Sequence, residues 1–220
     1  MGRKSQQDVR QRLLSVGLRL FAEKGYERAT VREICDAAQS NLAAINYYFR
    51  DKSGYYQEVC AYARSLRMAG LQHLVEASPD GDPWEVLSIH VDTLLNSSYD
   101  SELFLSNWLH LREYLNGENN TATAPTPQET DDRKLLEQQV PVLLAKILGE
   151  AATEQNIALL TYTYVSMSLF LIIQIKMDQN PQNTLRISQK LERLRLRDHI
   201  VDLVRVAADR MKRDYAASRS

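Results

Sequence analysis

The stretch from residue 30 to residue 49 reads TVREICDAAQSNLAAINYYF and predicts two short helices joined by a tight turn. Thr30 is a favourable N-cap, and Glu33 three residues later completes a capping box, so a helix begins at Val31. The apolar residues that follow have helical spacing and form one stripe: Val31, Ile34, Cys35 and Ala38. Asn41 is a second N-cap after the break at Gln39-Ser40. The pattern is that of a helix-turn-helix.

The second helix of this pair has two different faces. Leu42, Ile45 and Phe49 share an apolar face, which we expect to be buried. The opposite face carries small residues, an amide, an aromatic pair and a cation. Small residues allow a helix to approach a nucleic-acid groove, Asn can bond adenine, and Tyr can reach phosphate. This face favours DNA binding, and the alternative is an ordinary surface of a small helical bundle.

Three segments between about Arg12 and Tyr56 resemble the DNA-binding domain of the TetR family of bacterial transcriptional repressors. They read LFAEKGYERATVREICDAA, AAINYYF and DKSGYY, in the order and spacing of that family. AAINYYF is similar to the recognition helix of the subgroup with AAINY followed by His or Tyr and Phe. The resemblance covers about the first quarter of the chain.

The chain departs from the family pattern at two places. Gln39-Ser40 stands where the family often has Gly-Val, so we expect the turn to lack a left-handed residue and a small buried apolar contact. Asn46 stands where many members have Tyr, which should change the base that is read.

We expect the DNA contacts to follow the residue types. Base contacts should come from Ala43, Ala44, Asn46 and Tyr47, while Thr30, Tyr48 and Lys52 should hold phosphates. Lys52 lies at the start of a helix, where free N–H groups also favour a phosphate. We expect Arg32 and Asn41 to complete the interface.

Charge is segregated along the chain. Residues 1–52 hold ten Lys/Arg against six Asp/Glu, residues 53–180 hold seven against seventeen, and residues 181–220 hold ten against five. A basic N-terminal part fits a domain that binds DNA. Within the basic C-terminal part, we expect Arg193, Arg195 and Arg197 to pair with the acidic middle segment or with a partner chain; a second nucleic-acid patch is the alternative.

Composition predicts an all-α fold, because glycine is scarce, with 8 in 220 residues, and no run alternates as a strand does. We expect an N-terminal three-helix helix-turn-helix domain at 1–52 and a C-terminal helical bundle for ligand binding and dimerisation at 53–220. A mobile loop is expected at 117–130, where no large apolar residue occurs. The other expected helices span about 8–24, 53–76, 84–96, 101–116, 130–149 with a break near Pro141, 156–177 and 184–213.

The segment from Val165 to Ile175 is almost wholly apolar and is the only transmembrane candidate. Seven polar residues around it favour instead a helix buried in a core and a subunit interface. In the TetR family the last two long helices form a four-helix dimer interface, so the resemblance implies a homodimer through these helices. Two recognition helices could then read a palindromic operator.

The resemblance implies a cytoplasmic, ligand-responsive transcriptional regulator, most often a repressor, that a small-molecule effector releases from its operator. Polar and aromatic groups among aliphatic residues suggest the lining of the effector pocket: His90, Asn107, Trp108, Arg112, Tyr162 and Met167.

Other classes of function have little support in the sequence. We find no phosphate loop, nucleophile elbow or metal spacing, so we expect neither an enzyme nor a cofactor. Cys35 and Cys60 are expected to be buried structural thiols, with a redox sensor as the alternative. No apolar segment follows the first residues, so we expect no secretory signal. A helical adaptor that binds protein is the remaining alternative; salt-dependent, sequence-specific DNA affinity would exclude it.

Overall fold

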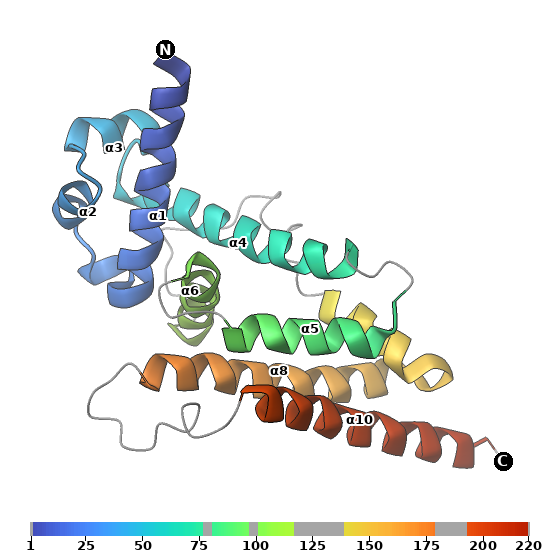
Figure 1. The fold of residues 1–220 in the computed structure, drawn as a ribbon. Helices are drawn as coiled ribbons and strands as arrows, with labels where there is room; N and C mark the ends of the chain where they lie inside the picture. The colour runs from blue at the N-terminus through green and yellow to red at the C-terminus, as the bar shows by residue number, and fades with distance from the viewer. Residues whose placement is uncertain (1, 77–80, 97–100, 117–138, 179–192, 220) are drawn as a thin grey trace. The chain divides into compact units, whose positions relative to one another are not determined.

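The computed structural model describes residues 2–76, 81–96, 101–116, 139–178 and 193–219. Within these ranges every regular element is a helix, so the predicted all-α fold is confirmed (Figure 1). The chain divides into two compact units, and each unit contains two separate stretches of the sequence. The expected mobile loop at 117–130 lies outside the described residues.

Unit 1 contains residues 1–69 and 100–132. Its described helices are α1 (Gly2–Arg28), α2 (Val31–Ala37), α3 (Leu42–Phe49), most of α4 (Lys52–Glu76) and α6 (Glu102–Asn116). α6 packs against α1, although more than 70 residues separate the two helices in the sequence. The first compact unit thus includes a helix from the middle of the chain, while a functional division after residue 52 stays a prediction.

An aromatic cluster forms the core of unit 1, where α1, α3 and α4 meet. The rings of Phe21 and Tyr56 lie 4.7 Å apart in an edge-to-face arrangement, and Phe49 lies 4.8 Å from Tyr55. The Tyr55 hydroxyl donates a hydrogen bond to the Leu13 carbonyl at 2.5 Å. These rings bury large areas, and the hydrogen bond satisfies the one polar atom of Tyr55.

Unit 2 contains residues 70–99 and 133–220. Its described elements are the end of α4, α5 (Pro83–Asn96), a helix at 139–148, the 3-10 turn η2 (Gly149–Ala151), α8 (Glu154–Asp178) and α10 (Arg193–Ala217). α10 packs against both α5 and α8 (Figure 1). The buried residues at the centre of this core come from α5, the 139–148 helix, α8 and α10: Leu87, Val91, Leu144, Leu160, Tyr164 and Val204.

Most helix limits agree with the sequence prediction within two residues. The exceptions are α1, which begins six residues earlier and ends four residues later than expected, and α10, which ends four residues later. Pro141 lies in the helix at 139–148, and the expected break near it stays a prediction. Residues 130–138 and 184–192 of the expected helices lie outside the described residues.

α8 is long and apolar enough to cross a membrane by length and composition alone, with a mean hydropathy of 1.7 over 18 residues. Only 22% of this window is buried within the chain. The core of unit 2 therefore covers one side of α8 and leaves much apolar surface uncovered.

Candidate DNA-binding surface

The start of α2 has the predicted capping box. The Thr30 hydroxyl accepts the Glu33 N–H at 3.2 Å, and the Thr30 N–H and O–H donate to the Glu33 carboxylate at 3.1 and 2.9 Å. Lys24 donates to the other carboxylate oxygen at 2.7 Å. The hydrogen bond from Lys24 and those from Thr30 lower the pKa of Glu33 to about 2. Both Thr30 donors are thus directed at Glu33, and the expected phosphate contact of Thr30 stays a prediction.

The turn after α2 contains a left-handed residue, contrary to the expectation from Gln39-Ser40. Gln39 has a φ of 47°, its N–H donates to the Asp36 carbonyl at 3.2 Å, and the Ser40 N–H donates to the Cys35 carbonyl at 2.9 Å. These two bonds form a Schellman motif, which requires a positive φ at its C′ residue. The bonding pattern determines this conformation, and Gln39 adopts it at a position that favours glycine.

α3 is anchored to unit 1 by two side chains. Ile45 and Phe49 are buried, and the Arg10 guanidinium lies 5.6 Å from the centre of the Phe49 ring. Asn41 caps the helix, because its side-chain oxygen accepts the Ala44 N–H at 3.0 Å. Leu42, which we expected on the buried face, is 58% exposed. Helical spacing gives the direction of Leu42 but cannot show whether a neighbouring helix extends far enough to cover it.

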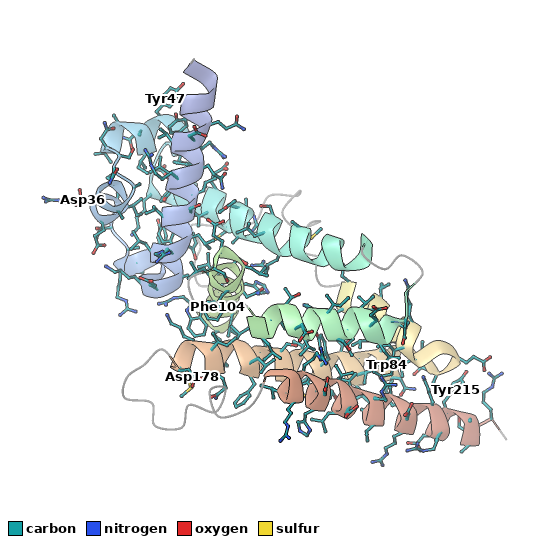
Figure 2. All side chains as sticks on the ribbon, in the orientation of Figure 1. Asp36, Tyr47, Trp84, Phe104, Asp178 and Tyr215 are labelled. Carbon is teal, nitrogen blue, oxygen red and sulfur yellow. The ribbon has the colours of Figure 1, made fainter. Side chains whose placement is uncertain are left out.

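The outward face of α3 consists of Ala43, Asn46, Tyr47 and Arg50, all of which are exposed. Tyr47 is 72% exposed and extends away from the unit, with its ring edge-to-face against that of Tyr48 at 4.9 Å (Figure 2). Ala44 and Tyr48 are half-buried beside this face, and Arg32 is exposed on α2. An aromatic ring that the fold leaves so exposed next to an amide and two small residues fits contact with another molecule.

Arg50, on the same face, has an unusual backbone conformation that the sequence did not reveal. Its φ is 73° and its ψ is −55°, and the Asp51 N–H donates to the Phe49 carbonyl at 2.9 Å. These values describe a γ-turn with positive φ, a strained conformation for a residue with a side chain. Asp51 caps the start of α4, because its carboxylate accepts the Gly54 N–H at 2.8 Å. The end of α3 is thereby fixed directly to the start of α4.

Lys52 points back to the end of α1. Its ammonium lies 3.4 Å from the Glu27 carbonyl oxygen and 4.5 Å from the centre of the Tyr26 ring. The side chain is half-buried at the first turn of α4, in the predicted position. Its contact with phosphate stays a prediction.

The six residues expected to line an effector pocket belong to different units. Asn107, Trp108 and Arg112 lie on α6 in unit 1, whereas His90, Tyr162 and Met167 lie in unit 2. The Tyr164 hydroxyl hydrogen-bonds the Nδ1 atom of His90 at 2.7 Å, and burial lowers the pKa of His90 to about 4. Tyr162 is 76% exposed. Their common pocket stays a prediction.

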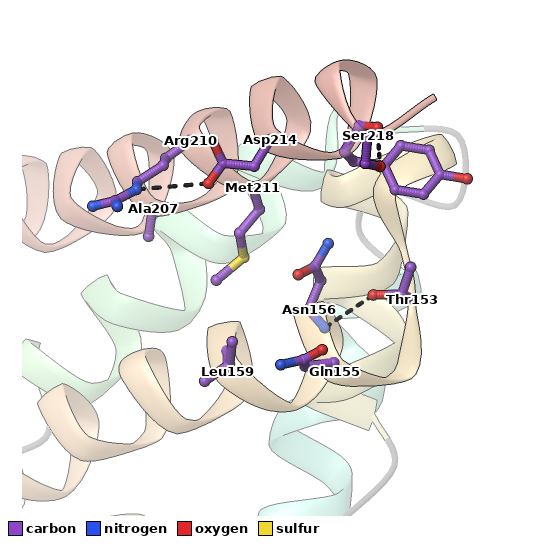
Figure 3. Close-up of a pocket in the computed structure, with 10 residues that line it drawn as sticks. Thr153, Gln155, Asn156, Leu159, Ala207, Arg210, Met211, Asp214 and Ser218 are labelled. Atoms are coloured by element: carbon purple, nitrogen blue, oxygen red, sulfur yellow. Dashed lines mark hydrogen bonds and ion pairs between the residues drawn. The ribbon is translucent and has the colours of Figure 1, made fainter. Parts of the chain in front are cut away.

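A hollow of about 520 Å³ lies between the start of α8 and the end of α10 (Figure 3). Asn156, Leu159, Arg210 and Asp214 are among its lining residues, and none of the six expected effector residues is. Its polar groups have partners within the chain, such as the Arg210 to Asp214 ion pair at 3.7 Å and the bond from Asn156 to the Ala151 carbonyl.

The two cysteines are poorly suited to thiolate chemistry. Cys35 is buried, and burial followed by the charge of Asp36 raises its pKa. Burial and then the Glu113 carboxylate raise the pKa of Cys60 to about 12. Within the described ranges, no three His, Cys, Asp or Glu side chains come together as a metal site would require.

Arg197 has the acidic partner expected from the charge pattern. Its guanidinium lies 3.1 Å from the Asp92 carboxylate of α5 and 2.7 Å from that of Asp198. This cation therefore joins α10 to the acidic middle segment.

Comparison with known proteins agrees with the geometry of α2 and α3. Residues 13–59 match the family described as bacterial regulatory proteins, tetR family. The HTH-type transcriptional regulator AcrR of Shigella flexneri is 33% identical over 105 residues, which are 46% of this chain and 48% of the relative. The HTH-type transcriptional repressor Rv1474c of Mycobacterium tuberculosis is 28% identical over 99 residues, which are 41% of this chain and 53% of the relative.

A third relative is the probable acrEF/envCD operon repressor of Escherichia coli K12, which is 32% identical over 79 residues, 36% of each chain. These matches thus span about a third to a half of the relatives' lengths. The helix-turn-helix of this chain, within residues 13–59, is similar to that of the tetR family of bacterial regulatory proteins.

Proposed function

We propose that this protein is a transcriptional repressor that binds a palindromic operator as a homodimer and leaves it when a small-molecule effector binds. The observation that carries the proposal is the outward face of α3, where Ala43, Asn46 and Tyr47 are exposed while Ile45 and Phe49 fix the helix. A rigid helix with small residues, an amide and an aromatic ring suits the major groove.

The apolar surface of α8 and α10 supports the homodimer. Large apolar side chains are exposed along both helices: Leu159, Val165, Phe170 and Met177 on α8, and Leu203 and Val206 on α10. The side-by-side arrangement of the two helices suits a four-helix interface with a second copy around a twofold axis. Such a dimer would present two recognition helices about 34 Å apart to successive turns of DNA.

Effector binding and DNA binding would be negatively coupled, so that each lowers the affinity for the other. A ligand bound in the C-terminal bundle, residues 53–220, would favour a conformation in which the two recognition helices no longer fit both half-sites. His90, Asn107, Trp108, Arg112, Tyr162 and Met167 are the proposed lining residues, and the cytoplasm is the proposed compartment. If an effector still releases the protein from DNA after Trp108, Tyr162 and Met167 are replaced by alanine, this pocket is wrong.

The test of DNA binding is selection of random duplexes by the purified full-length protein at two salt concentrations. We expect a palindromic consensus with half-site centres about one helical turn apart, and an affinity that falls steeply with salt. A duplex pool without enrichment at either salt concentration would contradict the proposal and favour the helical adaptor. The Asn46→Ala variant serves as the matched control for direct readout by α3.

A further inference from the structure

The end of α1 is irregular around Gly25, and we call the segment from residue 22 to residue 30 the elbow. Gly25 has a φ of 78° and a ψ of 169° inside the α1 helix, and the chain continues from there to Thr30 and α2. Carbonyl groups at the end of a helix lack intrahelical partners and carry partial negative charge. Cations that donate hydrogen bonds stabilise such an end.

Arg112 of α6 supplies most of the cap for this elbow. Its Nη1 atom lies 3.4 Å from the Ala22 carbonyl oxygen and 3.3 Å from that of Glu23, and its Nη2 atom lies 3.2 Å from that of Lys24. A Cβ atom added to Gly25 would come within 2.7 Å of the same guanidinium. Arg112 thus reaches one short stretch of backbone from a helix 88 residues away in sequence.

Side chains from α1 and α4 complete the cap. The Arg28 Nε donates to the Lys24 carbonyl at 3.1 Å, and the Lys52 ammonium lies 3.4 Å from the Glu27 carbonyl oxygen. Arg28 lies just before the helix-turn-helix segment at 30–49, and Lys52 lies just after it. Arg112 joins the elbow to α6.

α6 is itself bound to α4 by a second set of polar contacts. The Tyr62 hydroxyl donates to Glu102 at 2.6 Å, Arg67 donates to the Ser106 carbonyl at 2.9 Å, and the Tyr56 hydroxyl donates to Glu113. Among these polar contacts, Arg112 of α6 bonds α1, whereas Glu102, Ser106 and Glu113 of α6 bond α4.

We propose that Arg112 is a positioning residue that sets the direction of the chain from α1 into α2, and thereby the position of the DNA-binding surface. The proposal rests on DNA binding for its functional part. Its structural part, the control of the elbow by α6, is measured without DNA. This role differs from the effector contact that the sequence suggested for Arg112, because its terminal nitrogens here face α1.

The test compares hydrogen exchange in the full-length protein and three variants. Arg112→Met removes the cap, and Arg112→Lys keeps a charge with fewer directed donors. Tyr62→Phe removes the bond to Glu102 of α6, and the partners of this hydroxyl on α1, Gln11 and Ser15, lie outside residues 22–38. In Arg112→Met we expect amides in residues 22–38 to exchange roughly tenfold faster, with the rest of unit 1 little changed. The exchange rates of Arg112→Lys in residues 22–38 should fall between those of Arg112→Met and the unaltered protein. Tyr62→Phe should leave the exchange rates of residues 22–38 unchanged.

The same variants are then titrated with the duplex selected by the unaltered protein. We expect a dissociation constant about tenfold higher for Arg112→Met and a change of less than about twofold for Tyr62→Phe. Unchanged exchange at residues 22–38, or equally faster exchange throughout unit 1, would overturn the inference even if DNA binds. Absence of a selected duplex would count against the proposed function alone, because the exchange experiment decides the role of Arg112 independently.

Discussion

The carbonyl oxygen of Phe49 lies against Gly54 so closely that an added Cβ atom would be 2.3 Å from it. This contact joins the last residue of α3 to the first turn of α4. Alanine normally stabilises a helix relative to glycine, but here its methyl group would push the backbone of α3 away. We therefore expect Gly54→Ala to lower the free energy of unfolding by about 1–2 kcal/mol in urea denaturation.

The same substitution should weaken DNA binding, because it displaces the end of the recognition helix. Ser65→Ala, at an exposed position of α4, is the control for helix propensity and should change neither stability nor affinity by much. A Gly54→Ala protein that is more stable than the parent would show that α4 can shift without disturbing α3.

Gln39→Gly should stabilise the helix-turn-helix. At a φ of 47°, glycine avoids the steric penalty of a side chain but loses more conformational entropy on folding. We expect a net gain of about 0.5–1 kcal/mol in the free energy of unfolding. Gln39→Val should lower the free energy of unfolding, because β-branching makes positive φ less favourable. Equal urea midpoints for the two variants would contradict the assigned turn.

Asn46 and Lys52 should differ in how they affect DNA recognition. Asn46→Ala should lose about 1–3 kcal/mol at one base position and relax the preference there. Lys52→Ala should weaken all duplexes alike and reduce the salt slope by about one. Binding of a set of single-base operator variants, measured at several salt concentrations, checks both. A preference profile unchanged in Asn46→Ala would remove that side chain from the base contacts.

The capping box should make stability depend on pH in the acid range. The pKa of Glu33 is lowered from 4.5 to about 2, so its contribution is present above pH 4.5 and is lost as the pH falls toward 2. In urea titrations, the stability difference between the parent and Glu33→Gln should therefore be largest above pH 4.5 and should shrink toward pH 2. Lys24→Met removes the main cause of the lowered pKa and should move this loss to higher pH.

Charges on the exposed apolar face of α8 and α10 should separate the proposed dimer. Phe170 is 52% exposed and Val206 is 65% exposed, so glutamate at either position is tolerated in a monomer but would be buried in the interface. We expect each variant to raise the dimer dissociation constant at least about a hundredfold in sedimentation experiments. Val142→Glu, on the 139–148 helix, is the matched control, because that valine is similarly exposed outside α8 and α10. A dimer unaffected by both variants would place the interface elsewhere.

Local signals were sufficient to predict the limits of α2 and α3. Thr30, Glu33 and Asn41 cap these helices through bonds to residues three positions away, so their effect is visible in the sequence. The conformation of Gln39 was missed because it depends on backbone bonds of the turn and not on the residue type. The exposure of Leu42 depends on how far neighbouring helices extend, which spacing alone does not reveal.

Other features of the structure depend on contacts between residues far apart in the sequence, which the sequence does not reveal. Nothing near Arg112 in the sequence indicates that its guanidinium caps a helix 88 residues earlier. Gly54 reads as an ordinary weak point in a helix until the backbone of Phe49 is placed beside it. The expected DNA-binding residues are close together in the sequence, within one motif, so the sequence predicts that they lie on adjacent helices. The residues of an effector pocket come from distant parts of the chain, and the sequence does not show which of them meet.

The membership of α6 in unit 1 has a consequence for synthesis of the protein. The elbow of α1 must wait for the ribosome to add the 88 residues that follow Lys24 up to and including Arg112, which takes on the order of ten seconds at ordinary elongation rates. For most of that interval α1, α2 and α3 are complete, but one face of α1 lacks its partner helix. A nascent chain stalled before α6 would therefore leave this face of α1 uncovered, and the elbow would lack its bonds to Arg112 until the middle of the chain has emerged.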